Sequence, residues 1–302
     1  MKLLAIAQMT HKKILAGDIG GSHLTIGLFE EKESQLNLLH TERRAVDSSL
    51  SEDDILAQWY SIFRQYIDNP NDFQISLAMP APFDYENGIC LIKEQDKFKN
   101  LYGVNLKLKL SKGLDLPLTS IKFINDAEAF LQGEASFGKG ANFSTLLGLT
   151  LGSGLGSAYK AGEQVMDAEL WSSPFKEGLV EDYLGTIWFT NWAKKKFGRE
   201  ISGVKDILDS KDLNNEIGPL FKNYAKNLSE FLAREWRQHR FEAVVIGGNI
   251  SLSSHLFIDQ VSEGLRKEGI DLPIEISELG EMSALYGAAS LYFDTSRLRV
   301  SS

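Results

Sequence analysis

The stretch Ile14-Leu15-Ala16-Gly17-Asp18-Ile19-Gly20-Gly21-Ser22 decides the fold of this chain. An apolar run ends there in an acid and a pair of glycines, and a second run of strand-forming residues, Leu24 to Phe29, follows. Two such runs on either side of a glycine turn are typical of a β-hairpin. The chain therefore opens with two antiparallel strands, and Gln35 to Thr41 predicts a third.

Helix and strand patterns alternate through the rest of the sequence. Ser51-Glu52-Asp53-Asp54 is a capping-box pattern, and the apolar residues behind it, up to Tyr66, recur at helical spacing. Phe73 to Met79 predicts a buried strand. Further strands are predicted at 121–124, 144–151, 156–160 and 241–246, and helices at 127–137, 180–197 and 216–239, before a helix, a strand and a final helix. This mixed order, occurring twice, predicts an α/β fold with two lobes.

A loop-forming segment indicates where the lobes join. Residues 111–120 mix glycine, proline, serine and lysine, as joints between domains do. We therefore expect a small lobe at 14–120, joined by the C-terminal helix at about 282–295, and a large lobe at 121–281. Residues 1–13 are expected to be an N-terminal extension, because their apolar stretch is shorter than that of a usual signal peptide.

Composition excludes several classes of function. The 302 residues include 41 acidic and 32 basic ones, and a formal charge of -9 repels nucleic acid. Cys90 is the only cysteine, which excludes an intramolecular disulfide and a thiolate-rich zinc cluster and fits a reducing compartment. No run of 18 apolar residues occurs, so no membrane span is predicted. We expect a cytoplasmic protein without nucleic-acid or membrane partners.

Three glycine turns follow apolar strands, at Gly20-Gly21, at Gly152-Ser153-Gly154-Leu155-Gly156 and at Gly247-Gly248. Glycines let a backbone approach a ligand closely and aim N–H groups at an anion, so the first two could cradle phosphate and the third could admit a flat group. A plain turn is the alternative for each. Ser22 would add a hydroxyl donor, and Asp18 would hold a magnesium ion through its waters.

Four polar residues are candidates for work on a hydroxylated substrate. Asn125 and Asp126 end a predicted strand, where α/β folds bind ligands, and a carboxylate there can act as general base. The alternative is that Asp126 caps the following helix. Glu169 and Glu181 flank a loop and could accept paired hydrogen bonds from sugar hydroxyls, although a solvated acidic face is the alternative.

The order of six segments is more specific than any one of them. They are Asp18 to Ser22, Met79 to Asp84 with Asn87-Gly88, Asn125 to Ala129 with Gly133-Glu134, Leu149 to Gly156, Gly247 to Ser251, and Ala284 to Ala289. In this order they resemble the ROK family of sugar kinases, bacterial glucokinase-like members of the actin/hexokinase/Hsp70 superfamily. The resemblance extends from about Ile14 to Leu291.

The resemblance implies two RNase H-like lobes with a cleft between them, ATP and Mg²⁺ as cofactors, and Asp126 as the catalytic base. A homodimer is also expected, because family members often form dimers. For ATP it implies Asp18, Gly20, Gly21, Ser22, Gly152, Ser153, Gly154 and Gly156 at the phosphates, with Asp18 also holding Mg²⁺ through water, and Gly247 and Gly248 at the adenosine. For the sugar it implies Asn125, Asp126, Glu169, Glu181, Pro80 and Ala81.

Two departures from the family pattern concern the sugar side. Many members carry a zinc site of one histidine and three cysteines between the two glutamates, but here Ser172 stands in place of the histidine and the segment has no cysteine, so no zinc is expected. Residues 93–98 replace an asparagine-containing loop, with Gln95 or Asn100 as candidate substitutes. A helix-turn-helix repressor is rejected, because only about 13 residues precede the first strand.

The sequence therefore predicts ATP-dependent phosphorylation of a hexose, with glucose at its 6-hydroxyl favoured. An N-acetylhexosamine or fructose kinase is the alternative within the same class. A catalytically silent sugar or nucleotide sensor is the alternative of another class, and the loss of the zinc loop motivates it.

Overall fold

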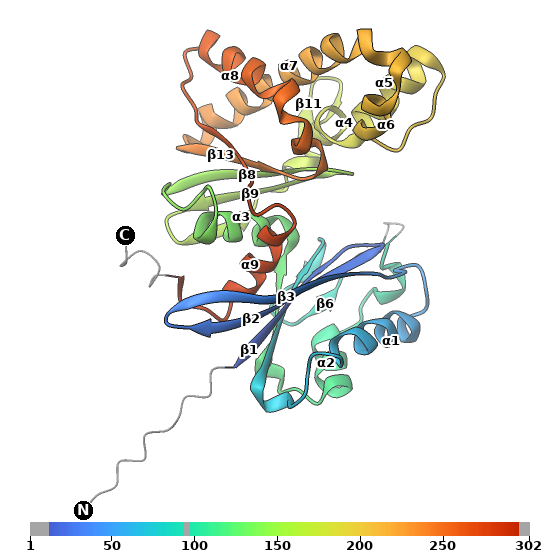
Figure 1. The fold of residues 1–302 in the computed structure, drawn as a ribbon, viewed down its shortest axis with the longest axis vertical. Coiled ribbons are helices and arrows are strands. Elements are labelled where there is room, and N and C mark those ends of the chain that lie inside the picture. The colour runs from blue at the N-terminus through green and yellow to red at the C-terminus, as the bar shows by residue number, and fades with distance from the viewer. Residues whose placement is uncertain (1–11, 94–96, 296–302) are drawn as a thin grey trace, which may run out of the picture. The chain divides into compact units, whose positions relative to one another are not determined.

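The computed structural model describes residues 12–93 and 97–295, which form two compact units (Figure 1). The first unit runs to Ala129 and takes up the chain again from Ala284, and the second unit is 130–283. Each contains one five-stranded sheet with helices packed on it. The predicted α/β fold with two lobes is confirmed. The expected N-terminal extension, 1–13, lies almost entirely outside the described residues.

The first sheet has the strand order β3-β2-β1-β4-β7. β1 (Lys13–Ile19) pairs antiparallel with β2 (His23–Lys32), and β2 with β3 (Gln35–Ala45), so the predicted hairpin and third strand are confirmed. On the other side of β1, β4 (Phe73–Met79) and then β7 (Ile121–Asn125) run parallel to it. The carboxyl ends of β1, β4 and β7 therefore share one edge of the sheet.

Helices of the first unit cover this sheet. α1 (Glu52–Phe63) begins after Ser51, whose hydroxyl oxygen accepts a hydrogen bond from the Asp54 N–H as predicted, and α1 and α2 (Leu106–Leu114) lie on the same side of the sheet in Figure 1. Trp59 of α1 is fully buried, which contributes about 2 kcal/mol or more of apolar burial. The remaining elements are η1 (Pro70–Asp72), β5 (Phe83–Asp84), β6 (Ile89–Cys90), η2 (Lys99–Leu101), η3 (Leu118–Ser120) and most of α9 (Met282–Ser290).

The division between the units differs from the predicted joint near residue 120. β7, which was expected to open the large lobe, pairs with β4 and so belongs to the first sheet. The first unit therefore continues into the first turn of α3 (Asp126–Phe137) and ends at Ala129. A strand belongs to the sheet that satisfies its backbone hydrogen bonds, and hydrophobic periodicity does not reveal which sheet that is.

The second sheet repeats the plan of the first, with the order β10-β9-β8-β13-β14. β8 (Thr145–Leu151) pairs antiparallel with β9 (Leu155–Ala161), and β9 with β10 (Gln164–Asp167). β13 (Ala243–Gly247) runs parallel to β8, and β14 (Ile274–Ile276) parallel to β13. The carboxyl ends of β8 and β13 therefore share one edge, as those of β1 and β4 do in the first unit.

Helices of the second unit pack over its sheet, with α7 (Asn214–His239) and α8 (Ile258–Lys267) on the side opposite to α3 in Figure 1. The predicted helix over 180–197 is two helices that separate at Gly185, and Tyr224 of α7 donates a 2.8 Å hydrogen bond to the carbonyl oxygen of Leu184 there. Burial of Tyr224 raises the pKa of its hydroxyl. The helices are α4 (Val180–Leu184), α5 (Thr186–Phe197), α6 (Val204–Asp209), α7 (Asn214–His239) and α8 (Ile258–Lys267), with η4 (Leu170–Ser172), η5 (Lys211–Leu213), η6 (Asn249–Leu256), β11 (Pro174–Phe175) and β12 (Gly178–Leu179).

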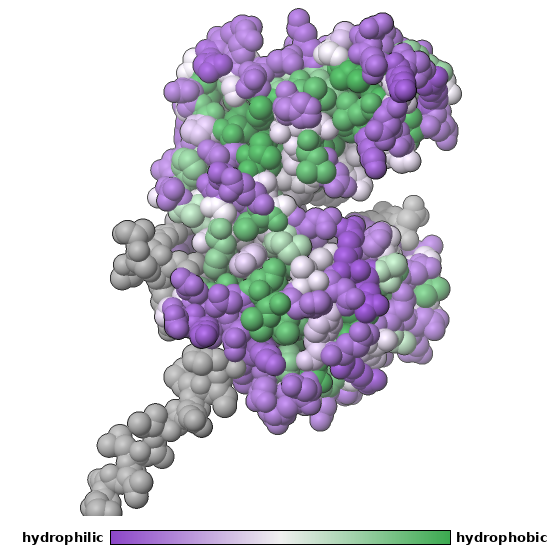
Figure 2. All heavy atoms as spheres, in the orientation of Figure 1, coloured by the Kyte–Doolittle hydropathy of each residue, from purple (hydrophilic) through white to green (hydrophobic). Residues whose placement is uncertain are grey.

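On the face shown in Figure 2, hydrophilic side chains cover most of each unit, and smaller hydrophobic areas show between them. None of the helices within residues 12–93 and 97–295 combines the length and the apolar character that crossing a membrane requires.

Candidate functional site

The turn between β1 and β2 carries the first group of predicted site residues. The Gly20 N–H closes the turn on the His23 carbonyl oxygen at 2.9 Å, and the carbonyl oxygens of Gly21 and Ser22 accept hydrogen bonds from the N–H groups of Ser48 and Val46. The N–H groups of Gly21 and Ser22 have no hydrogen-bond partner among the described residues. Two successive donors are therefore left for a ligand, as an anion-binding turn requires.

Two side chains flank this first turn. Asp18 is half-buried near the end of β1, beside Ala78 of β4, and its carboxylate is the kind of oxygen ligand that Mg²⁺ prefers. The Ser22 hydroxyl lies on the surface, with its Oγ 2.9 Å from Nδ1 of His23. The turn thus combines backbone donors, a hydroxyl and a carboxylate, which are groups suited to a phosphate and its metal ion.

The end of β7 at the same edge holds Asn125 and Asp126. The Asn125 side chain is only 2% exposed, and its Oδ1 accepts hydrogen bonds from the N–H groups of Ala127 and Glu128 at 2.8 and 3.1 Å. Asn125 therefore caps α3, the role that the sequence analysis had offered as the alternative for Asp126. Asp126 is exposed as the first residue of α3, and its Oδ1 also accepts a hydrogen bond from the Ala127 N–H at 2.8 Å.

Tyr85 is a residue at this edge that sequence reasoning missed. Its hydroxyl accepts a 3.1 Å hydrogen bond from Nδ2 of Asn125 and donates one of 3.1 Å to the Met79 carbonyl oxygen. This bond chain ties Asn125 at the end of β7 to Met79 at the end of β4, directly before the predicted sugar-side residues Pro80 and Ala81. Tyr85 directly follows the two-residue strand β5, and no periodic signal in the sequence predicted its role.

The turn between β8 and β9 is the counterpart of the first turn in the second unit. The Gly152 N–H donates to the Gly154 carbonyl oxygen at 3.0 Å, and the Leu155 N–H donates to Oε2 of Glu181 at 2.8 Å. The N–H groups of Ser153 and Gly154 have no hydrogen-bond partner in the described part of the chain. Each unit therefore offers one pair of successive unused donors at the turn of its central hairpin.

Gly247 and Gly248 are required by the packing at the end of β13. A Cβ on Gly247 would lie 2.5 Å from the Phe130 ring, and one on Gly248 would lie 2.4 Å from the Leu151 carbonyl oxygen. Gly248 also has φ +85° and ψ 168°, a region that is essentially restricted to glycine. This close approach places the third glycine turn against the last residue before the second turn.

The predicted sugar-side glutamates lie in different surroundings. Glu169 is exposed and has φ +49°, with its N–H donating to Oδ1 of Asp167 at 2.9 Å. Burial raises the pKa of the Asp167 carboxyl. Glu181, in contrast, is half-buried at the second turn, where Oε2 is bound to Leu155 and Oε1 has no partner among the described residues. Glu181 is thus shared between the turn and any ligand that reaches Oε1.

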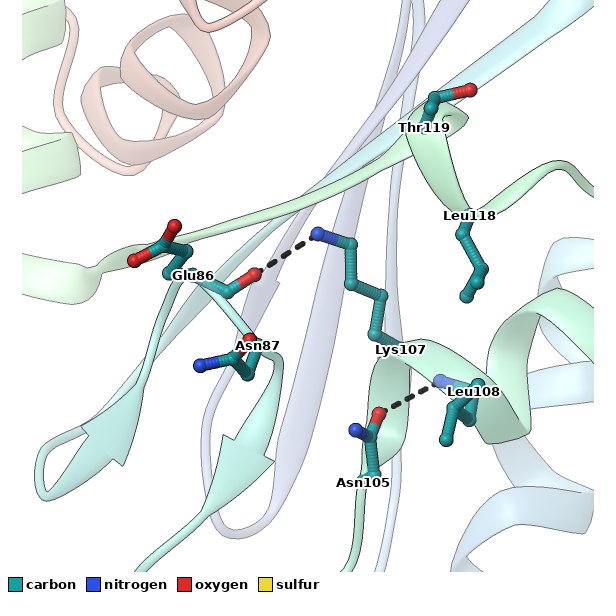
Figure 3. Close-up of a pocket in the computed structure, with 7 residues that line it drawn as sticks. All are labelled: Glu86, Asn87, Asn105, Lys107, Leu108, Leu118 and Thr119. Atoms are coloured by element: carbon teal, nitrogen blue, oxygen red, sulfur yellow. Dashed lines mark hydrogen bonds between the residues drawn. The ribbon is translucent and has the colours of Figure 1, made fainter.

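Other features of the chain fall outside this set. A shallow pocket of about 320 Å³ in the first unit (Figure 3) has Lys107 at its centre, donating to the Glu86 carbonyl oxygen at 3.0 Å, but none of the predicted site residues lines it. Asn100, one candidate for the sugar loop, donates instead to the carbonyl oxygens of Ser49 and Leu50. Gln95, the other candidate, lies outside the described residues.

The matching strand orders of the two sheets define an α/β protein of two repeated units, and the central hairpin turn of each unit leaves two successive N–H groups without a partner among the described residues. The family model for the ROK family matches residues 14–167 of this sequence. The chain belongs to the ROK family.

Individual relatives match this chain in sequence or in structure, each at low sequence identity. A glucokinase from Thermotoga maritima is 27% identical over 148 residues, which are 49% of this chain and 44% of that protein, so the match spans less than half of that relative's length. A candidate N-acetylmannosamine kinase from Listeria monocytogenes has a TM-score of 0.76 at 21% identity, covering 95% of this chain and 99% of that one. A ROK family glucokinase from Streptomyces griseus, solved with glucose and AMPPNP, has a TM-score of 0.73 at 19% identity, covering 92% and 98%.

Proposed function

We propose that this protein is an ATP-dependent sugar kinase that phosphorylates a hexose in the cytoplasm. The observation that carries the proposal is the pair of unused N–H donors in each hairpin turn, at Gly21-Ser22 and Ser153-Gly154, in a chain whose β7 edge also presents the carboxylate of Asp126. The named activities of the glucokinases and of the N-acetylmannosamine kinase candidate point to the same reaction class.

The two turns would bind the phosphates of ATP. Their backbone N–H groups would meet the negative charge of the transferring phosphoryl group, and such charge stabilisation is the main task in phosphoryl transfer. Asp18 would hold Mg²⁺ through its water ligands, and the ion would supply further neutralising charge. Gly247 and Gly248 have no side chains and would receive the adenosine. Gly152 and Gly156 would complete the second turn.

Asp126 would act as the base. In this role its carboxylate orients the sugar hydroxyl and takes its proton. The sugar oxygen bonds to the γ-phosphorus of ATP while the bond from that phosphorus to the bridging oxygen breaks and ADP leaves. Such base catalysis contributes about 10²–10⁴-fold to the rate. Asn125, Pro80 and Ala81 would line the sugar beside it, and Glu169 and Oε1 of Glu181 would accept hydrogen bonds from other hydroxyls. Glucose at its 6-hydroxyl is the favoured acceptor, and an N-acetylhexosamine or fructose is the alternative.

The test is ADP release from Mg-ATP with glucose, fructose, mannose, N-acetylglucosamine and N-acetylmannosamine. ADP release with one sugar that is lost in Asp126→Asn would support the proposal and identify the acceptor. If calorimetry detects sugar binding but no ADP is released from Mg-ATP in the presence of any of these sugars, the proposal is contradicted and a catalytically silent sensor is favoured. Size-exclusion chromatography with light scattering on the same sample would test the expected homodimer.

A further inference from the structure

Both ends of the second turn are held by the segment where α4 passes into α5. The Gly152 carbonyl oxygen accepts two hydrogen bonds from Thr186, one from its N–H at 2.9 Å and one from its Oγ1 at 2.7 Å. At the other end, the Leu155 N–H donates to Oε2 of Glu181 at 2.8 Å. All of these residues lie in the second unit, so the arrangement is internal to it.

Fixing these two groups fixes where the free donors of the turn point. In a planar trans peptide the C=O and the following N–H point in opposite directions. Because Thr186 holds the Gly152 carbonyl toward α5, the Ser153 N–H must point away from α5. A side chain at Gly154 would displace the Glu181 carboxylate, because its Cβ would lie 2.5 Å from Oε2. The shape of the turn is therefore set from outside the turn.

The β8–β9 pairing extends to Leu151 and Leu155, and the loop between these two residues has little else to define it. Among the described residues, the one hydrogen bond within this loop joins Gly152 and Gly154, and a Cβ added to Gly152 would meet no atom within 4 Å. Glycine-rich segments have the largest backbone freedom to lose on ordering. Without the hydrogen bonds to Thr186 and Glu181, the turn would lose this backbone entropy when a phosphate binds. The affinity for nucleotide would therefore fall.

We infer that Thr186 and Glu181 are positioning residues that hold the 152–156 turn in its phosphate-binding form. The inference rests on the proposed function, since it takes the turn to be a nucleotide site. Neither residue needs to touch the nucleotide for this role. Thr186 offers the cleaner test, because Glu181 also has an oxygen available to a sugar.

The experiment compares Thr186→Val, Thr186→Ser and wild type in the full chain. Valine keeps the shape of threonine and removes only the hydroxyl, whereas serine keeps it. Thr190→Val is the matched control, since Thr190 lies on the same helix and its Oγ1 donates to Ile187 and not to the turn. The primary readout is the Kd of AMPPNP with Mg²⁺ by calorimetry, with urea unfolding to verify that each variant is folded.

We expect Thr186→Val to raise the Kd of AMPPNP by roughly three- to tenfold, the effect of one lost hydrogen bond. Thr186→Ser and Thr190→Val should stay within twofold of wild type, and the KM for ATP should follow the Kd with kcat changed less. Equal AMPPNP affinity of folded Thr186→Val and wild type would overturn the inference alone. Wild type that binds no AMPPNP would overturn the proposed nucleotide site and, with it, this inference.

Discussion

The Nδ2 of Asn125 donates a 3.1 Å hydrogen bond to the hydroxyl of Tyr85, which in turn donates to the backbone of Met79 at 3.1 Å. The amide of Asn125 is thereby held with its Oδ1 on the first turn of α3, where Asp126 is exposed. The residue that precedes the proposed base is thus held by a tyrosine from the loop between β5 and β6.

Tyr85→Phe removes the partner of a buried amide donor. We expect the free energy of unfolding to fall by about 1–3 kcal/mol, because Nδ2 of Asn125 is left unsatisfied, and kcat to fall as Asp126 loses its orientation. Urea unfolding and steady-state kinetics measure both. Tyr102→Phe is the control, since Tyr102 is 53% exposed and lies away from this bond chain. Unchanged stability and kcat would mean that Tyr85 does not hold this edge.

Asp126→Asn tests the base directly. The amide is close in shape but cannot take a proton, so kcat should fall by about 10²–10⁴-fold while the Kd for the sugar changes only slightly. The exposed Asp271→Asn variant should leave both values unchanged. A wild-type kcat in Asp126→Asn would remove Asp126 from the role of base and would leave its place to another group.

Local patterns predicted most elements, and the exceptions have a common cause. The glycine turn at Gly20-Gly21 and the cap at Ser51 depend on neighbours in sequence, so both could be predicted. The partner of β7 could not be, because strand pairing is a contact between distant segments. The break at Gly185 was missed for the same reason: Thr186 turns to bind Gly152, 34 positions earlier.

In the candidate site, too, contacts between distant segments could not be predicted from the sequence. Residue types and their order identified Asp126 and the glycine turns, since these groups carry recognisable chemistry in sequence. The sequence did not decide which residue caps α3. In the structure the cap is Asn125, because its Oδ1 is the side-chain oxygen that accepts hydrogen bonds from the free N–H groups of Ala127 and Glu128. Tyr85 and Thr186 act through hydrogen bonds to distant backbone atoms, and no spacing in the sequence predicts such bonds.

Gly248→Ala should destabilise the second unit. The backbone at Gly248 has φ +85°, and occupying it with alanine costs about 1–3 kcal/mol even before the new Cβ meets the Leu151 carbonyl oxygen at 2.4 Å. Urea unfolding measures the loss. The control is Gly218→Ala on α7, where an added Cβ meets nothing within 4 Å and φ is not positive. A change of less than about 1 kcal/mol is expected there. Equal effects of the two substitutions would contradict the packing argument.

Tyr66 and Glu42 should give the first unit a pH-dependent contribution to stability. The Tyr66 hydroxyl donates to Oε2 of Glu42 at 2.6 Å, and this bond, with help from Arg44, lowers the pKa of the Glu42 carboxyl below its usual 4.5. A lowered folded-state pKa means that the contribution is present above about pH 4.5 and is lost as the pH falls through the lowered value. Burial and the same bond raise the pKa of Tyr66 to about 12.

In Tyr66→Phe the acid loss of stability should therefore become shallower, as measured by urea midpoints between pH 3 and pH 7. Tyr60→Phe is the matched control, because the Tyr60 hydroxyl donates to the backbone of Lys109 and not to a carboxylate. It should lower the midpoint by the same amount at every pH in this range. Parallel pH curves for wild type and Tyr66→Phe would show that the bond to Glu42 does not shift its titration.

Glu181 should couple the two substrates of the proposed reaction. One of its carboxylate oxygens holds the Leu155 N–H of the phosphate turn, and the other has no partner among the described residues. A sugar hydroxyl on Oε1 would restrict rotation of the carboxylate and so strengthen its hold on the turn. Sugar should then lower the Kd of AMPPNP, and AMPPNP should lower the Kd of the sugar by the same factor, because coupling between binding sites is reciprocal. A factor of roughly five or more is expected.

In Glu181→Ala the factor should fall to about one. In Thr186→Val, which weakens the turn but keeps the shared carboxylate, coupling should persist. Calorimetric titrations of each ligand with and without the other measure these factors, and wild-type coupling in Glu181→Ala would show that the two sites communicate by another route.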